Sequence, residues 1–198
     1  LLQLSRAQAC ARRINEVLDA VSSVQNQEQP SPLPAPRGRV EFKDVSFKYA
    51  ASGTGDDVLS HISFTVEPGQ LVSIVGGTGT GKSSLVNLIP RFYDVTGGSV
   101  LVDGVDVRDY PLEELRSRIG MVLQTNILFT GTIRENLLWG KPDASEEEIV
   151  QAARDAQAYD FIMAFPDGFD TQLTQGGTNV SGGQKQRLCI ARAMLRKP

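Results

Sequence analysis

Eight residues in the first half of the chain form a loop suited to binding phosphate groups. Residues 76–83 read GGTGTGKS, which matches the pattern GxxxxGKS. Glycines let a backbone wrap closely around a phosphate chain, so that several N–H groups point at negative oxygens. Lys82 adds a positive charge, and Ser83 supplies a hydroxyl of the kind that coordinates magnesium beside the outer phosphates. The pattern predicts a site for nucleotide phosphates held with Mg2+.

Apolar spacing predicts the elements on either side of this loop. Residues 71–75 form a short apolar run, which is typical of a central strand covered on both faces. Alternating apolar residues predict two half-buried strands before it, at 40–49 with a break at Asp44, and at 62–66. Strand and helix signals then alternate, which favours an α/β core with an antiparallel β appendage. The later strands are expected at 99–102 and 119–123, and the later helices at 112–118, 132–139 and 146–165.

A second motif narrows the class of nucleotide-binding protein. Residues 181–187 read SGGQKQR and lead into an apolar helical pattern. Here the sequence resembles the nucleotide-binding domain of ABC transporters, whose signature is LSGGQ, with Val180 in place of the leucine. The resemblance covers nearly all of residues 39–198. It implies an α/β P-loop NTPase fold of the ABC type, with an antiparallel β appendage and a helical subdomain, incomplete at the C-terminus.

The resemblance implies roles for individual residues. Tyr49 corresponds to the aromatic residue that stacks on adenine, and the alternative is a strand-end tyrosine packed in the β appendage. Gln124 corresponds to the glutamine that approaches magnesium and the attacking water, so it is the expected catalytic residue and, with Ser83, a metal ligand. The alternative for Gln124 is a solvated loop amide. The residues expected to bind nucleotide are Tyr49, Gly76, Gly77, Thr78, Gly79, Thr80, Gly81, Lys82, Ser83, Ser84, Ser181, Gly182, Gly183 and Gln184.

The first 38 residues differ from those that follow. Apolar residues recur at steps of three and four from Leu4 to Val21, which predicts an amphipathic helix. Residues 25–38 contain four prolines, which favours an extended linker. The helix resembles the cytoplasmic end of the last transmembrane helix in exporters that carry membrane and ATPase domains on one polypeptide. We therefore expect the end of a transmembrane helix at 1–24, a linker at 25–38 and the nucleotide-binding domain at 39–198. The alternative for the first segment is a helix packed on its own domain.

The resemblance implies a function and partners. The chain is expected to be the ATP-binding domain of an ABC exporter, which couples ATP binding and hydrolysis to export of a solute or lipid. Its expected partners are ATP, Mg2+, a transmembrane domain of the same polypeptide and a second nucleotide-binding domain in a head-to-tail dimer at the cytoplasmic face of a membrane. The alternative is a soluble ABC ATPase acting on nucleic acid or ribosomes. A net charge of −3 offers no general attraction for nucleic acid.

The final residues lack the acidic groups that hydrolysis needs in this family. Residues 171–198 contain no Asp, Glu or His. The resemblance therefore implies an ATP hydrolase in the full-length protein, while these 198 residues are expected to be soluble and to bind nucleotide without turnover, for want of the catalytic Glu. Asp103 precedes Gly104 and lies out of order, so it is interpreted as a turn residue. Cys10 and Cys189 lie far apart and outside a CxxC pattern, which argues against a disulfide scaffold or a zinc site.

Overall fold

The computed structural model describes residues 2–26, 32–49 and 57–198. It divides into two compact units, residues 1–112 and 113–198. The first unit contains the antiparallel sheet and the predicted phosphate-binding loop, and the second contains most of the helices and the SGGQ motif.

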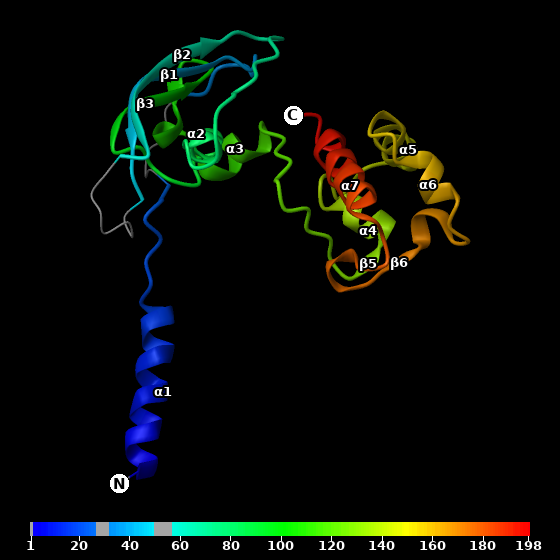
Figure 1. Cartoon of the computed structure of the whole chain (residues 1–198), viewed down its shortest axis with the longest axis horizontal. Helices are drawn as coiled ribbons and strands as arrows, with labels where there is room; N and C mark the ends of the chain where they lie inside the picture. The colour runs from blue at the N-terminus through cyan, green and yellow to red at the C-terminus, as the bar shows by residue number, and fades with distance from the viewer. Residues whose placement is uncertain (1, 27–31, 50–56) are drawn as a thin grey trace. The chain divides into compact units, whose positions relative to one another are not determined.

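An antiparallel sheet organises the first unit (Figure 1). Strand β1 (Val40–Phe47) lies between β2 (Leu59–Val66) and β3 (Gly97–Val102), and the short β4 (Val105–Asp106) pairs with β3. The predicted break in β1 is present. Asp44 has a φ of 50°, and the register of the pairing between β1 and β2 shifts between residues 42 and 45. The buried side chains of β1 are Phe42, Val45 and Phe47. The β appendage predicted from alternating apolar residues is thus confirmed.

One glycine permits the close packing at this break. Gly98 of β3 has a φ of 71°, and a Cβ at this position would lie 2.3 Å from the carbonyl oxygens of Lys43 and Asp44. A side chain there would collide with backbone, which is unable to move aside as a side-chain tip does. The bulged part of β1 therefore depends on the absence of a side chain at Gly98.

The predicted N-terminal helix is present as α1 (Leu2–Leu18). Every side chain from residue 6 to residue 18 is exposed, including Ile14 and Leu18 of the apolar stripe. Whether this helix ends a transmembrane segment or packs on its own domain stays a prediction. Within the described part of the chain, no helix is both long and apolar enough to span a membrane.

The chain enters β1 through an anchored segment. Residues 32–39 form no helix and no strand, but three consecutive backbone N–H groups, those of Arg37, Gly38 and Arg39, donate to the carboxylate of Asp103 at 2.9–3.1 Å. Asp103 and Gly104 form the turn between β3 and β4, with φ angles of 51° and 83°. Asp103 is thus a turn residue as predicted, and it also holds the end of the predicted linker.

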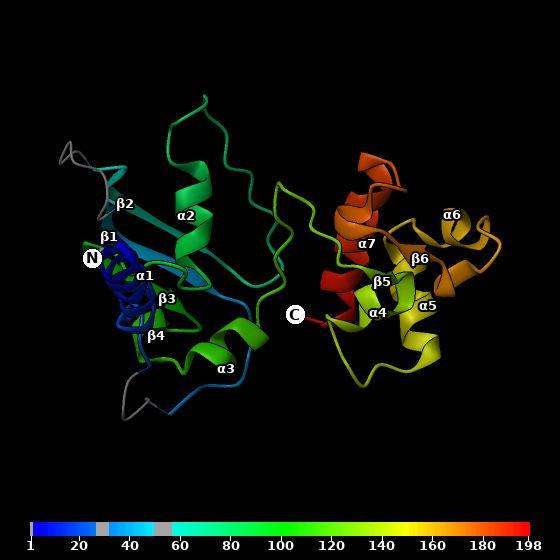
Figure 2. The same cartoon turned by 90° about the horizontal axis from the view of Figure 1, so that it is seen from below.

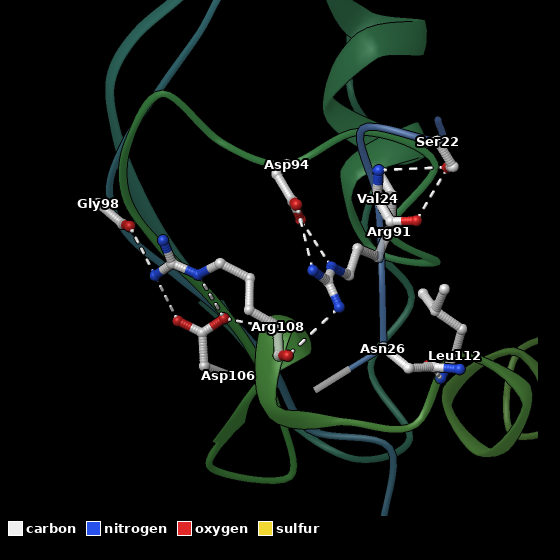
Figure 3. A network of polar contacts seen from close by, with 9 residues as sticks. All are labelled: Ser22, Val24, Asn26, Arg91, Asp94, Gly98, Asp106, Arg108 and Leu112. Carbon is white, nitrogen blue, oxygen red and sulfur yellow. Dashed lines mark hydrogen bonds and ion pairs between the residues drawn. The ribbon is translucent and has the colours of Figure 1, made fainter. Parts of the chain in front are cut away.

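A polar network fixes the segment that leads from α2 (Lys82–Leu88) back to the sheet (Figure 3). Arg91 is only 5% exposed, and its Nε and Nη2 donate to the two carboxylate oxygens of Asp94 at 2.6 and 3.1 Å. Its Nη1 donates to the carbonyl of Arg108 at 3.3 Å. The Arg108 side chain in turn donates to Asp106 and to the carbonyl of Gly98. This network ties the return segment to the β3–β4 hairpin.

The second unit is a cluster of helices around one apolar core (Figure 2). Helices α4 (Ile133–Leu138) and α5 (Glu146–Asp155) pack against the longer α7 (Gly182–Leu195). Ile133, Ile149 and Leu188 lie in the core between them. Thr132 and Ser145 close reciprocal capping boxes at the starts of α4 and α5. The second is predicted by the sequence, in which Glu148 follows Ser145 by three positions. The elements of this unit are α3 (Leu112–Ser117), which begins at the boundary, β5 (Gly131–Thr132), α4 (Ile133–Leu138), α5 (Glu146–Asp155), α6 (Tyr159–Met163), β6 (Gln172–Leu173) and α7 (Gly182–Leu195).

The structure contradicts two predicted strands. Neither residues 71–75 nor residues 119–123 form a strand, and Leu71 and Val75 are 96% and 91% exposed. Strands are held by hydrogen bonds to neighbouring strands, and none of the strands in the described ranges pairs with either segment. An apolar run indicates only that a segment is able to join a sheet. The prediction was wrong because a strand also requires a neighbouring strand with which to form hydrogen bonds.

Two further expectations need correction in the second unit. The helix expected at 146–165 is divided into α5 and α6, because Gln157 between them takes a left-handed φ of 54°. Aromatic residues are most often buried, which predicts core positions for Phe129 and Trp139. They are instead 45% and 66% exposed, and they stack on each other with ring centroids 5.0 Å apart. Their contact with each other replaces burial in the core.

Replacing Arg91 with lysine tests the polar network. We expect Arg91→Lys to destabilise the first unit by about 1.5 to 3 kcal/mol, because an ammonium group cannot make the two-pronged contact with Asp94 and also reach the carbonyl of Arg108. Hydrogen exchange at the amides of β3 and β4 measures the loss. Arg37→Lys is the matched control, since the exposed Arg37 bonds to Asp103 through its backbone. Equal exchange in both variants would contradict the role given to Arg91.

Candidate functional site

The phosphate-loop residues take the backbone shape that their glycines permit. Gly79 and Gly81 have left-handed φ angles of 82° and 83°, and Gly81 directly precedes α2 as its N-cap. A Cβ on Gly81 would lie 2.8 Å from Leu59 Cδ2 and 2.9 Å from the carbonyl oxygen of Val58. Glycine is therefore required at position 81 both for its φ and for the close approach to the start of β2.

Lys82 lies over the loop that precedes it. Its Nζ donates to the carbonyl oxygen of Gly76 at 2.9 Å, to that of Gly77, and to Thr80 Oγ1 at 3.5 Å. The Thr80 hydroxyl also donates to the carbonyl of Gly77 at 3.0 Å. These oxygens hold the ammonium group at the loop, where phosphate oxygens would compete for the same donor. Ser83 follows with its side chain exposed.

The structure brings Tyr49 to the same loop. One cavity of about 280 Å3 is lined by Tyr49, Val58 and residues 79–84. The Tyr49 hydroxyl lies 2.8 Å from Ser84 Oγ on α2, although 35 positions separate the two residues. An aromatic ring and a phosphate-binding loop in one cavity have the arrangement that a nucleotide requires. That Tyr49 stacks on adenine stays a prediction.

The SGGQ motif begins a helix in the second unit. Ser181 is the N-cap of α7; its Oγ accepts from the N–H of Gln184 at 3.2 Å, and its own N–H donates to Gln184 Oε1 at 2.8 Å. A Cβ on Gly182 or Gly183 would meet nothing within 4 Å. Val180 before them is 7% exposed and belongs to the apolar core, as an apolar residue in the leucine position should.

Polar contacts that the sequence analysis missed hold α7 in place. Arg187 donates to the carbonyl of Gln157 at 3.0 Å and lies over the ring of Phe161, 5.0 Å from its centroid. Glu148 accepts from Lys141 and from Lys197, which follows the end of α7, each at 2.7 Å. Only the capping role of Glu148 has a sequence signal, in the spacing from Ser145. The ion pairs join residues up to 49 positions apart and have no local pattern.

These contacts also determine the ionisation of Glu148. Hydrogen bonds from Lys141, Lys197 and the Ser145 amide lower its pKa to about 2. Because the pKa of Glu148 is lower in the folded chain than its ordinary value of 4.5, ionised Glu148 stabilises the fold at pH values above 4.5. That stabilisation is lost as the pH falls toward 2. Glu148 is therefore ionised throughout the neutral range, as its ion pairs with Lys141 and Lys197 require.

The remaining predicted site residue, Gln124, is exposed and lies outside helices and strands, after residues 119–123. It belongs to the second unit, as do Ser181, Gly182, Gly183 and Gln184, whereas Tyr49 and residues 76–84 belong to the first. In the first unit, Tyr49 and residues 79–84 line one cavity. A shared action of the two sets at one nucleotide stays a prediction.

Comparison with known proteins assigns the family. Residues 59–198 match the model of the family described as ABC transporter. The chain belongs to the ABC transporter family. Two of its relatives are named as multidrug export ATP-binding/permease proteins. YgaD of Bacillus subtilis is 52% identical over 162 residues, covering 82% of this chain and 28% of the relative. A Staphylococcus aureus protein is 45% identical over 183 residues, covering 92% of this chain and 31% of the relative.

A solved structure of the same family confirms the fold. The chain matches the structure of a bacterial Atm1-family ABC exporter with ATP bound, at a TM-score of 0.89 and 34% identity. The match covers 98% of this chain and 33% of the exporter chain, so the chain spans about a third of the length of the relatives it matches. The predicted α/β P-loop fold of the ABC type is therefore confirmed.

Replacing Gly81 with alanine tests the geometry of the phosphate loop. We expect Gly81→Ala to cost about 1 to 3 kcal/mol, because a residue with a Cβ is strained at this φ and would also meet Val58 and Leu59. Hydrogen exchange at the α2 amides should become faster. Gly77→Ala is the control in the same loop, since its Cβ would make only an ordinary contact with Thr80 at 3.9 Å. Equal exchange in the two variants would show that the close approach of Gly81 is unnecessary.

Proposed function

We propose that this chain is the ATP-binding domain of an ABC exporter, in which ATP binding and hydrolysis by the complete protein drive export of a solute or lipid. The observation that carries the proposal is the cavity shared by Tyr49, Lys82 and the loop glycines. It offers a ring for a base and an ammonium group for phosphates within one unit. The exporter relatives, including one solved with ATP bound, support this assignment.

The residues at the loop fit Mg2+ bound together with a nucleotide. Among the described residues, no cluster of three or more His, Cys, Asp or Glu side chains is able to hold a metal ion alone. Mg2+ commonly keeps several waters and uses one or two protein ligands together with substrate phosphates. Ser83 would supply its exposed hydroxyl to such an ion, and Gln124 a side-chain oxygen. The ion would neutralise phosphate charge, while Gln124 would orient the attacking water.

The open start of α7 supports a role in a pair of nucleotide-binding domains. Gly182 and Gly183 have space for a side chain, so packing within this chain does not require glycine at either position. Glycines at an exposed helix start leave N–H groups accessible to an anion. We infer that Ser181 and these glycines close over the nucleotide of a second domain in a head-to-tail dimer.

The N-terminal segment favours an exporter over a soluble ABC ATPase acting on nucleic acid or ribosomes. The relatives are named as ATP-binding/permease proteins, and the match to the S. aureus protein covers 92% of this chain. The exposed helix α1 fits the cytoplasmic end of a transmembrane helix, followed by a linker at 25–38 and the nucleotide-binding domain at 39–198. The complete protein would then work at the cytoplasmic face of a membrane, with its transmembrane domain as the partner.

Nucleotide binding by the phosphate loop is tested with Lys82→Ala. We expect affinity for Mg-ATP to fall about 10- to 100-fold, because charge-assisted hydrogen bonds to phosphate oxygens are lost. Isothermal titration calorimetry measures the change. Lys43→Ala removes an exposed lysine from β1 and should bind ATP as the unmodified chain does. Unchanged affinity in Lys82→Ala would remove the phosphate-loop assignment.

The dimer is tested by comparing substitutions of two serines, Ser181 and Ser145, each of which is the N-cap of a helix. Ser181→Arg should abolish ATP-dependent dimerisation of the complete protein, because a long cationic side chain would obstruct the surface that faces the partner's nucleotide. Ser145→Arg removes the matching N-cap from α5, so each variant should lose about 1 kcal/mol of capping energy. Only Ser181→Arg should lose the dimer in light scattering. Normal dimerisation of Ser181→Arg would contradict the proposed role of the motif.

A further inference from the structure

A buried asparagine holds the chain that follows Gln124. Asn136 of α4 is only 1% exposed, and its Oδ1 accepts from the N–H of Phe129 at 2.9 Å. Its Nδ2 donates to the carbonyl oxygens of Phe129 and Thr132 at 2.9 and 3.0 Å. A buried amide with partners for both its oxygen and its nitrogen has one favoured orientation. The backbone at Phe129 and Thr132 is therefore fixed against α4.

Arg192 joins the same segment to α7, the helix that Ser181 caps. Its Nε donates to the backbone carbonyl of Asn136 at 2.8 Å, and its Nη2 donates to Asn136 Oδ1 at 3.1 Å. Its Nη1 donates to the carbonyl of Ile127 at 3.1 Å. The planar guanidinium group directs these three bonds at once, which the single ammonium group of a lysine is unable to do. Arg192 thus bridges α7, α4 and the chain three positions beyond Gln124.

No carboxylate compensates the charge of Arg192. In the part of the chain that the structure describes, its side chain hydrogen-bonds only to carbonyl and amide oxygens and forms no ion pair. Partial burial lowers the pKa of Arg192, so the charged form is less favourable there than in water. An apolar side chain of similar length, such as methionine, would avoid the free-energy cost of that burial. What the arginine adds is the geometry of its three contacts.

Packing connects the two segments at a second place. Leu128 is 2% exposed, and a Cβ on Gly177 would lie 2.9 Å from Leu128 Cδ1. Gly177 lies four positions before Ser181, and Leu128 lies four positions after Gln124. The chain beyond Gln124 therefore contacts both the segment that leads into α7 and, through Arg192, the body of α7.

We propose that Arg192 and Asn136 are positioning residues that hold Gln124 and the SGGQ start of α7 together as one rigid part of the second unit. The inference rests on the proposed function, because it takes Gln124 as the residue that orients the attacking water. Neither Arg192 nor Asn136 acts on nucleotide or metal directly; each acts through the backbone that carries Gln124. Loss of either should therefore slow hydrolysis by the complete protein, because a displaced Gln124 would orient water poorly.

The single tryptophan of the chain, Trp139, reports on this segment. Its indole stacks on Phe129 with ring centroids 5.0 Å apart. The next residue, Gly140, lies so close to α7 that a Cβ there would collide with the carbonyl oxygen of Arg192. The indole is therefore carried by a turn held on α7, whereas its stacking partner belongs to the segment under test. We expect Arg192→Met to increase quenching of Trp139 fluorescence by acrylamide, because Phe129 would move away from the indole.

Arg134→Met is the matched control, since it removes an arginine of α4 whose ion pairs go to Glu146 and Asp170. It takes two polar contacts from the second unit but leaves the hydrogen bonds of the segment after Gln124 in place. Acrylamide quenching should be the same in Arg134→Met as in the unmodified chain. Unchanged quenching in Arg192→Met would overturn the inference, because the segment would then be held without the arginine.

Turnover tests the function of this geometry. In the complete protein, we expect Arg192→Met to lower kcat for ATP hydrolysis about 10- to 100-fold, the order expected when a positioned group is displaced. Arg192→Lys keeps the charge and is able to make only some of the bonds, so its kcat should lie between the two. Arg134→Met should keep the kcat of the unmodified protein.

Asn136→Asp provides a second variant of equal size. It keeps an oxygen for Arg192 but loses both Nδ2 donors, so a carboxylate would face the carbonyl oxygens of Phe129 and Thr132. Repulsion between these oxygens should displace the segment and lower kcat as well.

ATP binding in the presence of EDTA shows whether the first unit is intact. Without metal or hydrolysis Gln124 has no role, and Tyr49 and residues 76–84 belong to the first unit. The affinity should therefore be the same in Arg192→Met and the unmodified chain. A fall in this affinity would overturn the inference, since Arg192 would then act on the fold as a whole.

The same measurements distinguish failure of the inference from failure of the proposed function. If the unmodified complete protein hydrolyses ATP and kcat is unchanged in both Arg192→Met and Asn136→Asp, the proposed function stands and the positioning roles are wrong. An equal loss of kcat in Arg134→Met would overturn them too. If the unmodified complete protein does not hydrolyse ATP, the proposed function fails, and the inference fails with it. Increased quenching and slower turnover in Arg192→Met, with Arg134→Met unaffected, is the result that supports both.

Discussion

The predicted nucleotide site of the first unit depends on one close approach, between the backbone of Gly81 and the residues at the start of β2. Gly81 lies against the carbonyl of Val58 and the side chain of Leu59, at a distance that leaves no space for a Cβ. This contact places the start of α2 beside the start of β2, and Lys82, Ser83 and Ser84 follow from there in helical order. Ser84 then reaches Tyr49, two residues beyond the end of β1. A shift at Gly81 would therefore displace the phosphate loop and the aromatic ring together.

The sequence predicted best those parts of the molecule whose signals are local. The phosphate loop, the capping of α5 and the serine that begins α7 each depend on residue types within a few positions of one another. The break at Asp44 was also visible, because alternation of apolar residues changes phase there. Features of this kind need no knowledge of the rest of the fold.

Features that depend on distant residues could not be predicted in the same way. Residues 71–75 and 119–123 have strand composition, yet a strand forms only where another supplies hydrogen bonds. The pairing of Tyr49 with Ser84 likewise has no local pattern. The division between α5 and α6 is a different case, since Gln157 adopts a positive φ without the glycine or asparagine that usually marks it. The surrounding packing overrides its intrinsic preference.

The vacant space around Gly182 and Gly183 has a consequence for mutational surveys of this chain. Stability depends on contacts within the molecule, and these two positions make none that a Cβ would disturb. A survey that scores only whether each variant folds would therefore accept many residues there, while it rejected almost every substitution at Gly98. If the proposed function is correct, constraint on the two glycines would emerge only in a survey that scores the activity of the complete protein. The contrast between the two surveys would then separate positions needed for architecture from positions needed for function.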